Sequence, residues 1–164
     1  MMNNEELPTI GSRAEFGAAL RWGFDQSIAR GARRIVCVDR DFADWPLDDG
    51  ALHAQLAGWL RRPLRKLVLL ASSFDEMPLR HPRFVAWRAL WSHALEAWSP
   101  ADSTGLALPT LLIDDGPISV ELIDAVHWRG RVESDPRTAQ IWRDTVDAVL
   151  QRSEPAFAVN RLGL

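Results

Sequence analysis

Polar residues that could bind a ligand or take part in catalysis follow two short apolar runs of this 164-residue chain. Carboxylates can act as nucleophiles, general bases or magnesium ligands, and histidine or serine can assist them. The carboxyl ends of parallel strands meet at one edge of a sheet, where open α/β sheets bind ligands. The sequence therefore predicts a ligand-binding site at this edge. Its candidate residues are Asp39, Asp41, Trp45, Ser72, His81 and, from a later turn, Asp115.

Each candidate also has a structural interpretation. Acidic and small polar residues dominate loops and helix caps regardless of function. Trp45 could fold back as a lid on the core, because an indole usually buries its face or stacks on something. His81 stands just before Pro82 and could cap the helix that starts there. Both interpretations stay open at this point.

The segment IVCVDRD resembles the D-x-D nucleophile motif of haloacid-dehalogenase-like phosphatases. LVLLASS stands in the place of their second motif and LLIDD in the place of the acidic fourth. The resemblance implies a metal-assisted phosphohydrolase that uses Asp39 and Asp41. That chemistry also needs a lysine between the second and fourth motifs, and residues 73–113 contain none. The phosphohydrolase is therefore the alternative function.

Other common chemistries lack their motifs. The chain has no G-x-S-x-G elbow, and its four histidines show no metal-binding spacing. Cys37 is the only cysteine, which excludes an intramolecular disulfide and a cysteine-rich metal site. We expect neither a metal ion nor a cofactor.

Alternating helices and strands should position the candidate residues. Ser12 and Glu15 form a capping-box pattern at the start of the first helix, and Ser134 or Asp135 precedes a helix-starting proline at the last. Between them the pattern predicts strands at 33–39, 65–71 and 94–100, helices around 52–60 and after 82, and a hairpin at 108–124. This order predicts an α/β fold with a mixed, largely parallel sheet and helices on both faces.

The hairpin and last helix resemble the C-terminal half of a phospholipase-D-like domain. That family carries H-x-K-x-x-x-x-D in one strand, G-S-x-N in the next, and then a closing helix. Here Asp115-Gly116 matches the turn, SVELIDAV the second strand, and SDPRTAQIWRDTVDAVLQRSEP the closing helix. The resemblance spans residues 12–154 and is closest to a proteobacterial group of unknown function. That group shares the D-x-D, the DD turn, the RSEP exit and a His-Pro helix start like His81-Pro82.

The catalytic positions of that family are changed. With Asp115 in the acid place, Leu108 holds the histidine place and Thr110 the lysine place. Without a nucleophile or a fixed cation, the family's phosphodiester hydrolysis cannot start. The resemblance therefore implies a catalytically degenerate domain that acts as a binding or protein-interaction module. Because active members build one site from two halves, a lone half implies a homodimer.

Composition indicates one globular domain, with 47% hydrophobic and 25% charged residues. Residues 1–11 are expected to form a flexible leader, 12–154 the domain, and 155–164 a tail packed on it. The net charge of −3 argues against a broad basic face, so nucleic acid is not expected as a partner. No apolar run is long enough to span a membrane and no signal peptide is present, which favours a cytoplasmic protein.

Overall fold

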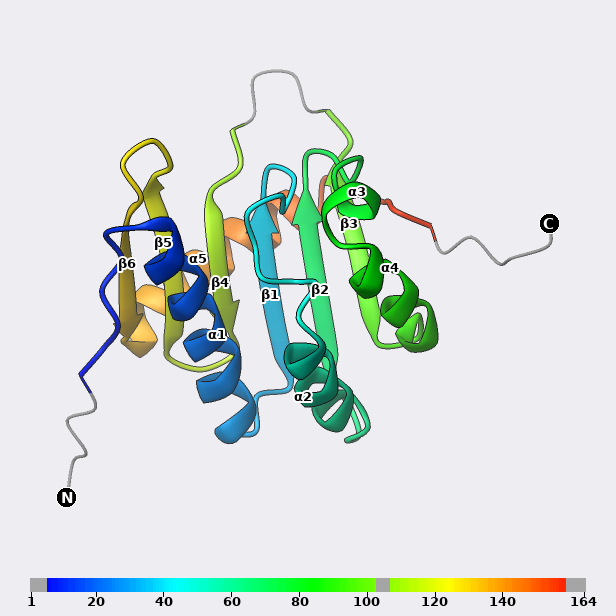
Figure 1. Ribbon diagram of the computed structural model, residues 1–164, viewed down its shortest axis with the longest axis horizontal. Coiled ribbons are helices and arrows are strands. Elements are labelled where there is room, and N and C mark those ends of the chain that lie inside the picture. Colours follow the sequence, from blue (N-terminus) through cyan, green and yellow to red (C-terminus); the bar gives the residue numbers. More distant parts are fainter. Residues whose placement is uncertain (1–5, 103–106, 159–164) are drawn as a thin grey trace.

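The computed structural model describes residues 6–102 and 107–158 of the chain. Its helices are α1 (Arg13–Ala29), α2 (Gly50–Leu60), α3 (Met77–Arg80), α4 (Pro82–Arg88) with the 3-10 turn η1 (Ala89–Trp91), and α5 (Pro136–Leu150). Its strands are β1 (Arg34–Asp39), β2 (Lys66–Ala71), β3 (Leu95–Pro100), β4 (Thr110–Asp114), β5 (Ile118–Asp124), β6 (Arg129–Ser134) and β7 (Ser153–Pro155). The strands form one seven-stranded sheet in the order β6-β5-β4-β1-β2-β3-β7 (Figure 1).

Strand β1 lies at the centre of the sheet, parallel to β2 and antiparallel to β4. Side chains alternate across a strand, so Cys37 faces one core cluster while Val36 and Val38 face the other. Burial raises the pKa of the Cys37 thiol, which therefore serves as a small apolar core residue. Both faces of β1 are thus shielded from solvent.

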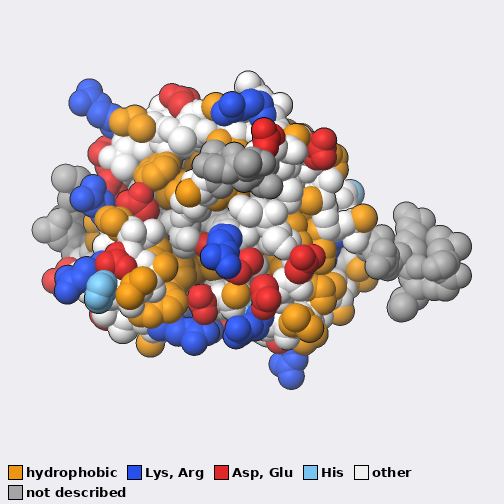
Figure 2. Space-filling view, turned by 90° about the horizontal axis from the view of Figure 1, so that it is seen from above, with side chains coloured by type: hydrophobic (Ala, Val, Ile, Leu, Met, Phe, Trp, Pro, Cys, Tyr) orange, Lys and Arg blue, Asp and Glu red, His pale blue; other side chains and the backbone are white. Residues whose placement is uncertain are grey.

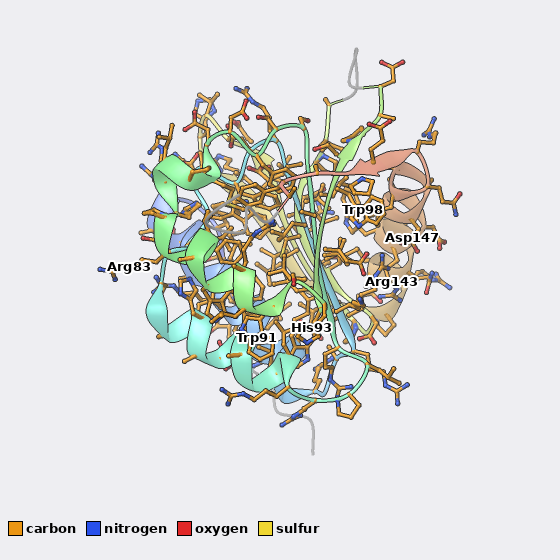
Figure 3. The ribbon with its side chains drawn as sticks, turned by 90° about the vertical axis from the view of Figure 1, so that its right-hand side faces the viewer. Arg83, Trp91, His93, Trp98, Arg143 and Asp147 are labelled. Atoms are coloured by element: carbon orange, nitrogen blue, oxygen red, sulfur yellow. The ribbon has the colours of Figure 1, made fainter. Side chains whose placement is uncertain are left out.

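Helices cover both faces of the sheet. Helices α1, α2, α3 and α4 lie on one face, and α5 lies on the other (Figures 1 and 3). The larger core cluster packs under the four helices and includes Phe16, Phe24 and Trp59. The smaller cluster packs under α5 around Val146, with Trp98 against it. The predicted α/β fold with helices on both faces is confirmed.

The expected predominance of parallel pairing is wrong. In the described chain, β1–β2 and β2–β3 are parallel, whereas β1–β4, β4–β5, β5–β6 and β3–β7 are antiparallel. The difference comes mainly from β6 and β7, which the sequence pattern did not predict. Only Val132 of β6 is buried, so this edge strand lacks a clear apolar alternation, and β7 has just three residues.

Short polar side chains fix the ends of the helices. Ser12 accepts a hydrogen bond from the Glu15 amide (3.1 Å), as the capping-box pattern predicts. Asp135, rather than Ser134, caps α5 by accepting from the Arg137 amide. At α4 the cap comes from outside the helix, because Asp48 Oδ1 accepts from the Arg83 amide at 2.7 Å.

The two ends of the described chain pack on the domain. Ile10 is 8% exposed and belongs to the larger core cluster, although it lies within the expected leader. The Ala156 amide donates to the Ala97 carbonyl, and the Phe157 ring stacks on Phe74 with centroids 5.1 Å apart. Residues 1–5 and 159–164 of the expected leader and tail lie outside the described residues. None of the described helices is both long enough and apolar enough to cross a membrane.

Gly130 should be required for the β5–β6 pairing. A β-carbon at this position would overlap the Glu121 carbonyl oxygen and lie 2.7 Å from Ile10 Cδ1. We expect Gly130→Ala to lower the free energy of unfolding by about 1–3 kcal/mol, measured by urea denaturation. The control is Gly17→Ala in α1, where a β-carbon meets no atom within 4 Å and removing a helix glycine stabilises by up to about 1 kcal/mol. Equal unfolding midpoints for the two variants would contradict the packing described at Gly130.

Candidate functional site

The carboxyl ends of β1, β2 and β3 form the upper edge of the sheet in Figure 1. Asp39, the last residue of β1, accepts hydrogen bonds at Oδ2 from the amides of Asp41 (3.3 Å) and Phe42 (2.8 Å). Its Oδ1 accepts from the Thr110 hydroxyl at the start of β4. The carboxylate thus ties the β1–α2 loop to the neighbouring strand. It also supports Phe42, a buried residue with a positive φ of 61°.

Trp45 and His81 are both buried. Trp45 is 3% exposed, and its ring packs edge-on against Phe42 with centroids 5.0 Å apart. His81 is 5% exposed, and its Nε2 lies 2.7 Å from the Phe42 carbonyl oxygen. A carbonyl can only accept, so Nε2 carries the proton that it donates. His81 is the N-cap residue of α4, as one interpretation expected, but only its carbonyl accepts a helix hydrogen bond, from the Val85 amide, and its side chain makes no capping bond.

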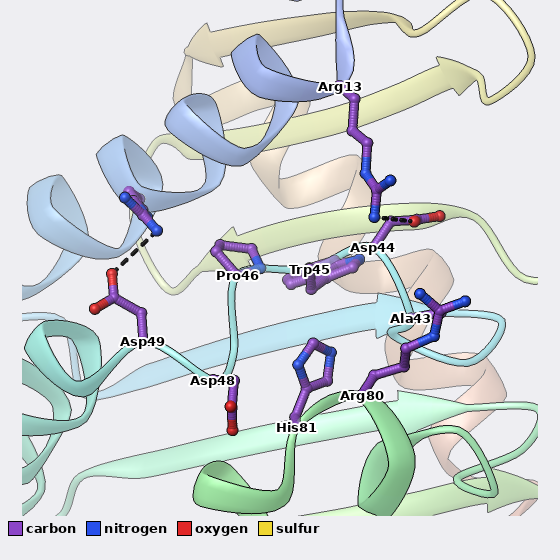
Figure 4. A pocket seen from close by; sticks show the side chains of 10 residues that line it. Arg13, Ala43, Asp44, Trp45, Pro46, Asp48, Asp49, Arg80 and His81 are labelled. Atoms are coloured by element: carbon purple, nitrogen blue, oxygen red, sulfur yellow. Dashed lines mark ion pairs between the residues drawn. The ribbon is translucent and has the colours of Figure 1, made fainter.

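Trp45 and His81 also line an open pocket of about 420 Å³ between α1 and the β1–α2 loop (Figure 4). Four of the six charged side chains that line it form two ion pairs with each other. Arg13 pairs with Asp44 at 3.0 Å, and Arg21 pairs with Asp49 at 3.1 Å. A charged ligand would therefore have to displace existing ion pairs. Seen from above, the upper edge shows basic and acidic side chains interspersed (Figure 2).

The remaining predicted site residues are dispersed. Asp41 lines a neighbouring pocket of about 410 Å³ with Asp39 and Trp45, but without His81. The Ser72 side chain lines neither pocket, and its amide donates to the Arg40 carbonyl. Asp115 lies at the opposite edge of the sheet, where it accepts from the Arg33 amide at 3.1 Å. The structure thus brings together Asp39, Asp41 and Trp45 in one pocket, whereas His81 lines only the other pocket, with Trp45.

The hairpin that resembles the phospholipase-D-like motif in sequence uses several of its side chains for structural contacts. Leu108 packs against the smaller core cluster, and Thr110 donates its hydroxyl proton to Asp39. Asp114 is 3% exposed, and its Oδ1 accepts from the amides of Gly116 and Ile118. Arg143 of α5 donates to the carbonyls of Asp114 and Gly116. These side chains build the turn and join β4 to β1 and α5.

The alternative phosphohydrolase gains no geometric support. Both oxygens of Asp39, its proposed nucleophile, accept structural hydrogen bonds. Across residues 6–102 and 107–158, no three His, Cys, Asp or Glu side chains are grouped so that they could hold a metal ion. Asp41 Oδ1 accepts from the Ala43 amide, which completes a turn rather than a cation site.

A surface that the sequence analysis missed lies at the amino ends of β1 and β2. Two loops meet there, since the Lys66 amide donates to the Arg33 carbonyl (2.9 Å) and Trp59 Nε1 donates to the Ala32 carbonyl (2.6 Å). Both loops lie at the lower edge in Figure 1. We call the arginines of these loops the basic edge: Arg30, Arg33, Arg61, Arg62 and Arg65.

The guanidinium groups of the basic edge have no acidic partner. None of the five forms an ion pair with another described residue. All are exposed except the half-buried Arg65. The flanking Arg34 and Lys66 differ, because they pair with Asp147 and Glu96. The segments RGARR and RRPLRK, each just before a strand, were the sequence signal for this surface.

Comparison with known proteins identifies a similar fold but does not assign the chain to a family. No protein family matches the chain, and neither does any curated protein. Among solved structures, the chain is similar to an archaeal chromatin protein, TrmBL2, whose structure is described as showing a novel mode of DNA binding. The TM-score is 0.63 at 13% identity, over 95% of this chain and 57% of that one. The chain therefore spans a little over half the length of its structural neighbour, and the likeness shows a shared α/β fold.

This likeness corrects the expectation about nucleic acid. The net charge of −3 led us not to expect nucleic acid as a partner. That exclusion is wrong, because the same fold forms part of a DNA-binding chromatin protein. Net charge sums over the whole surface, whereas binding depends on the charges of one face.

Removing the Asp39 carboxylate should destabilise the fold. Asp39→Ala leaves two amides and the Thr110 hydroxyl without their acceptor, so we expect the free energy of unfolding to fall by about 1–3 kcal/mol. Asp39→Asn keeps one acceptor oxygen and should lose less. Urea denaturation measures both, and a double-mutant cycle with Thr110→Val should show coupling between the two sites. If the Asp39 variants keep the stability of wild type, and Asp39→Asn abolishes a magnesium-dependent phosphatase activity, the alternative function as a phosphohydrolase would be supported instead.

Proposed function

We propose that this chain is a non-catalytic binding domain of phospholipase-D-like architecture, and that it binds the phosphate backbone of nucleic acid through the basic edge. The observation that carries this proposal is the group of five unpaired arginines on two adjacent loops. Other described arginines, such as Arg83 and Arg129, also form no ion pair, but these five are brought together by two loops that meet. Here they remain available to an external anion.

Arginine suits this partner for a geometric reason. Its planar fork donates two parallel hydrogen bonds to a phosphate, and it is charged at every physiological pH. Two arginines lie on the loop before β1 and three on the loop before β2. Several phosphates along one backbone could therefore be contacted at once. Two carboxylates also lie at this edge: Asp114 is buried and accepts from the Gly116 and Ile118 amides, and Asp115 accepts from the Arg33 amide.

The hairpin supports the non-catalytic part of the proposal. Leu108 and Thr110 stand where the family mechanism needs a nucleophile and a cation, and both have structural contacts instead. Asp39 is similarly engaged. A bound phosphodiester would meet guanidinium donors at the basic edge, with no group placed to attack phosphorus.

The structural neighbour supports the choice of partner. TrmBL2 is a chromatin protein whose structure shows DNA binding, and most of this chain shares its fold. The homodimer implied by the resemblance and the cytoplasmic location stay predictions.

Binding of duplex DNA should be electrostatic and should depend on the basic edge. We expect the purified chain to bind a fluorescent 20-base-pair duplex with a dissociation constant of roughly 1–100 μM, measured by anisotropy. Arg61→Gln/Arg62→Gln should weaken binding and make the slope of log K against log salt shallower by about 2, one unit for each lost phosphate contact. Wild type should leave the duplex uncleaved, with or without magnesium.

The matched control is Arg83→Gln/Arg129→Gln. Both of these arginines are exposed and form no ion pair with any described residue. Arg83 projects from the outer side of α4 (Figure 3), and Arg129 begins β6 at the upper edge. The two double variants have the same net charge, so an equal loss of affinity in both would contradict binding at the basic edge. If the wild-type chain does not bind the duplex at low salt, the proposed function is wrong.

A further inference from the structure

Leu64 is an exposed apolar side chain among the arginines of the basic edge. It is 79% exposed and lies between Arg62 and Arg65 in the loop before β2. Its φ of 60° falls in the left-handed region, which disfavours any residue with a β-carbon. Glycine adopts this conformation at much lower cost. Neither burial nor the backbone of the turn therefore explains a leucine at this position.

The turn that carries Leu64 is held from both sides. The Arg62 amide donates to the Trp59 carbonyl (3.1 Å), which joins the turn to the end of α2. On the other side, Arg65 Nη1 donates to the Pro63 carbonyl at 3.2 Å. A turn that is already ordered loses little conformational entropy when it binds. The leucine is thus presented to a partner in a fixed position.

An apolar side chain flanked by cations complements a surface on which anionic groups border an apolar interior. In a nucleic-acid duplex, phosphates border grooves whose floor is formed by base pairs. Apolar side chains, leucine and proline among them, can insert between base pairs from the minor groove and partly unstack them. Resting on the proposed function, we infer that Leu64 is a wedge that inserts between base pairs while the basic edge holds the flanking phosphates.

An anionic membrane presents a similar pattern, but it fits this surface less well. Stable attachment to a membrane takes a larger apolar area or a second anchor. Among the described residues, Leu64 is the only large exposed apolar side chain in the two loops of the basic edge. The cations beside it are arginines, whose forks match individual phosphates. A single apolar side chain among guanidinium groups that can donate hydrogen bonds to phosphates therefore favours a nucleic-acid duplex over a membrane as the partner.

A wedge implies a preference for duplexes that unstack easily. Opening a base step costs free energy, and the cost is lower at a mismatch or at a flexible TA step. The chain should therefore bind a duplex with one central mismatch more tightly than the matched duplex. Phosphate contacts are equal in the two duplexes, so the arginines alone would not produce this difference.

The test compares wild type with Leu64→Gly on the mismatched and matched duplexes by fluorescence anisotropy. Leu64→Gly removes the wedge and relieves the positive φ, so its melting temperature should equal or exceed that of wild type. We expect affinity for the mismatched duplex to fall about tenfold, the mismatch preference to vanish, and the salt slope to stay unchanged. Leu79→Ser is the control, because Leu79 is similarly exposed (76%) but lies in α3 near the upper edge.

The outcomes separate this inference from the proposed function. If Leu64→Gly keeps the mismatch preference of wild type, the wedge is overturned while phosphate binding by the arginines stands. If wild type binds neither duplex, both are overturned. Sedimentation with phosphatidylserine vesicles that depends on Leu64, without any mismatch preference, would overturn the wedge in favour of a membrane contact.

Discussion

The parallel pairing of β1 with β2 is the constraint on which the rest of the structure depends. β1 is buried on both faces and pairs residue by residue with β2, from Arg34 opposite Lys66 to Asp39 opposite Ala71. Parallel neighbours place both of their incoming loops at one edge and both outgoing loops at the other. The arginines before each strand consequently meet at the lower edge, and the polar residues after each strand meet at the upper edge.

The two edges use their charged residues differently. At the upper edge, Asp39 accepts hydrogen bonds from two backbone amides and the Thr110 hydroxyl, and along the β1–α2 loop Asp44 and Asp49 pair with arginines of α1. A carboxylate that satisfies backbone amides stabilises a loop and is poorly placed to react. At the lower edge the five guanidinium groups form no ion pair, and only Arg30 and Arg65 donate to neutral oxygens, those of Ser134 and Pro63. The two edges therefore differ in how many of their charged groups are paired with each other.

Local patterns predicted the elements that carry strong signals. Ser12 and Pro136 mark the starts of α1 and α5 through capping chemistry, which acts within a single turn. β6 was missed because an exposed edge strand with one buried residue lacks periodicity. The site was predicted only in part. The loops after β1 and β2 do converge, as predicted. The hydrogen bond from His81 to the Phe42 carbonyl could not be predicted, because it depends on packing between segments 39 residues apart in the sequence.

Net charge alone does not exclude an anionic partner, because electrostatic interactions in salt are short-ranged. β1 has six residues and so spans roughly 20 Å at about 3.3 Å per residue. The Debye length at physiological ionic strength is about 8 Å, so the acidic residues of the upper edge lie more than two screening lengths from the basic edge. A phosphate that approaches the lower loops therefore experiences the five arginines and the nearby Asp115, and little of the charge at the upper edge. Once β1 separates the two groups, a chain with net charge −3 can present a locally cationic surface.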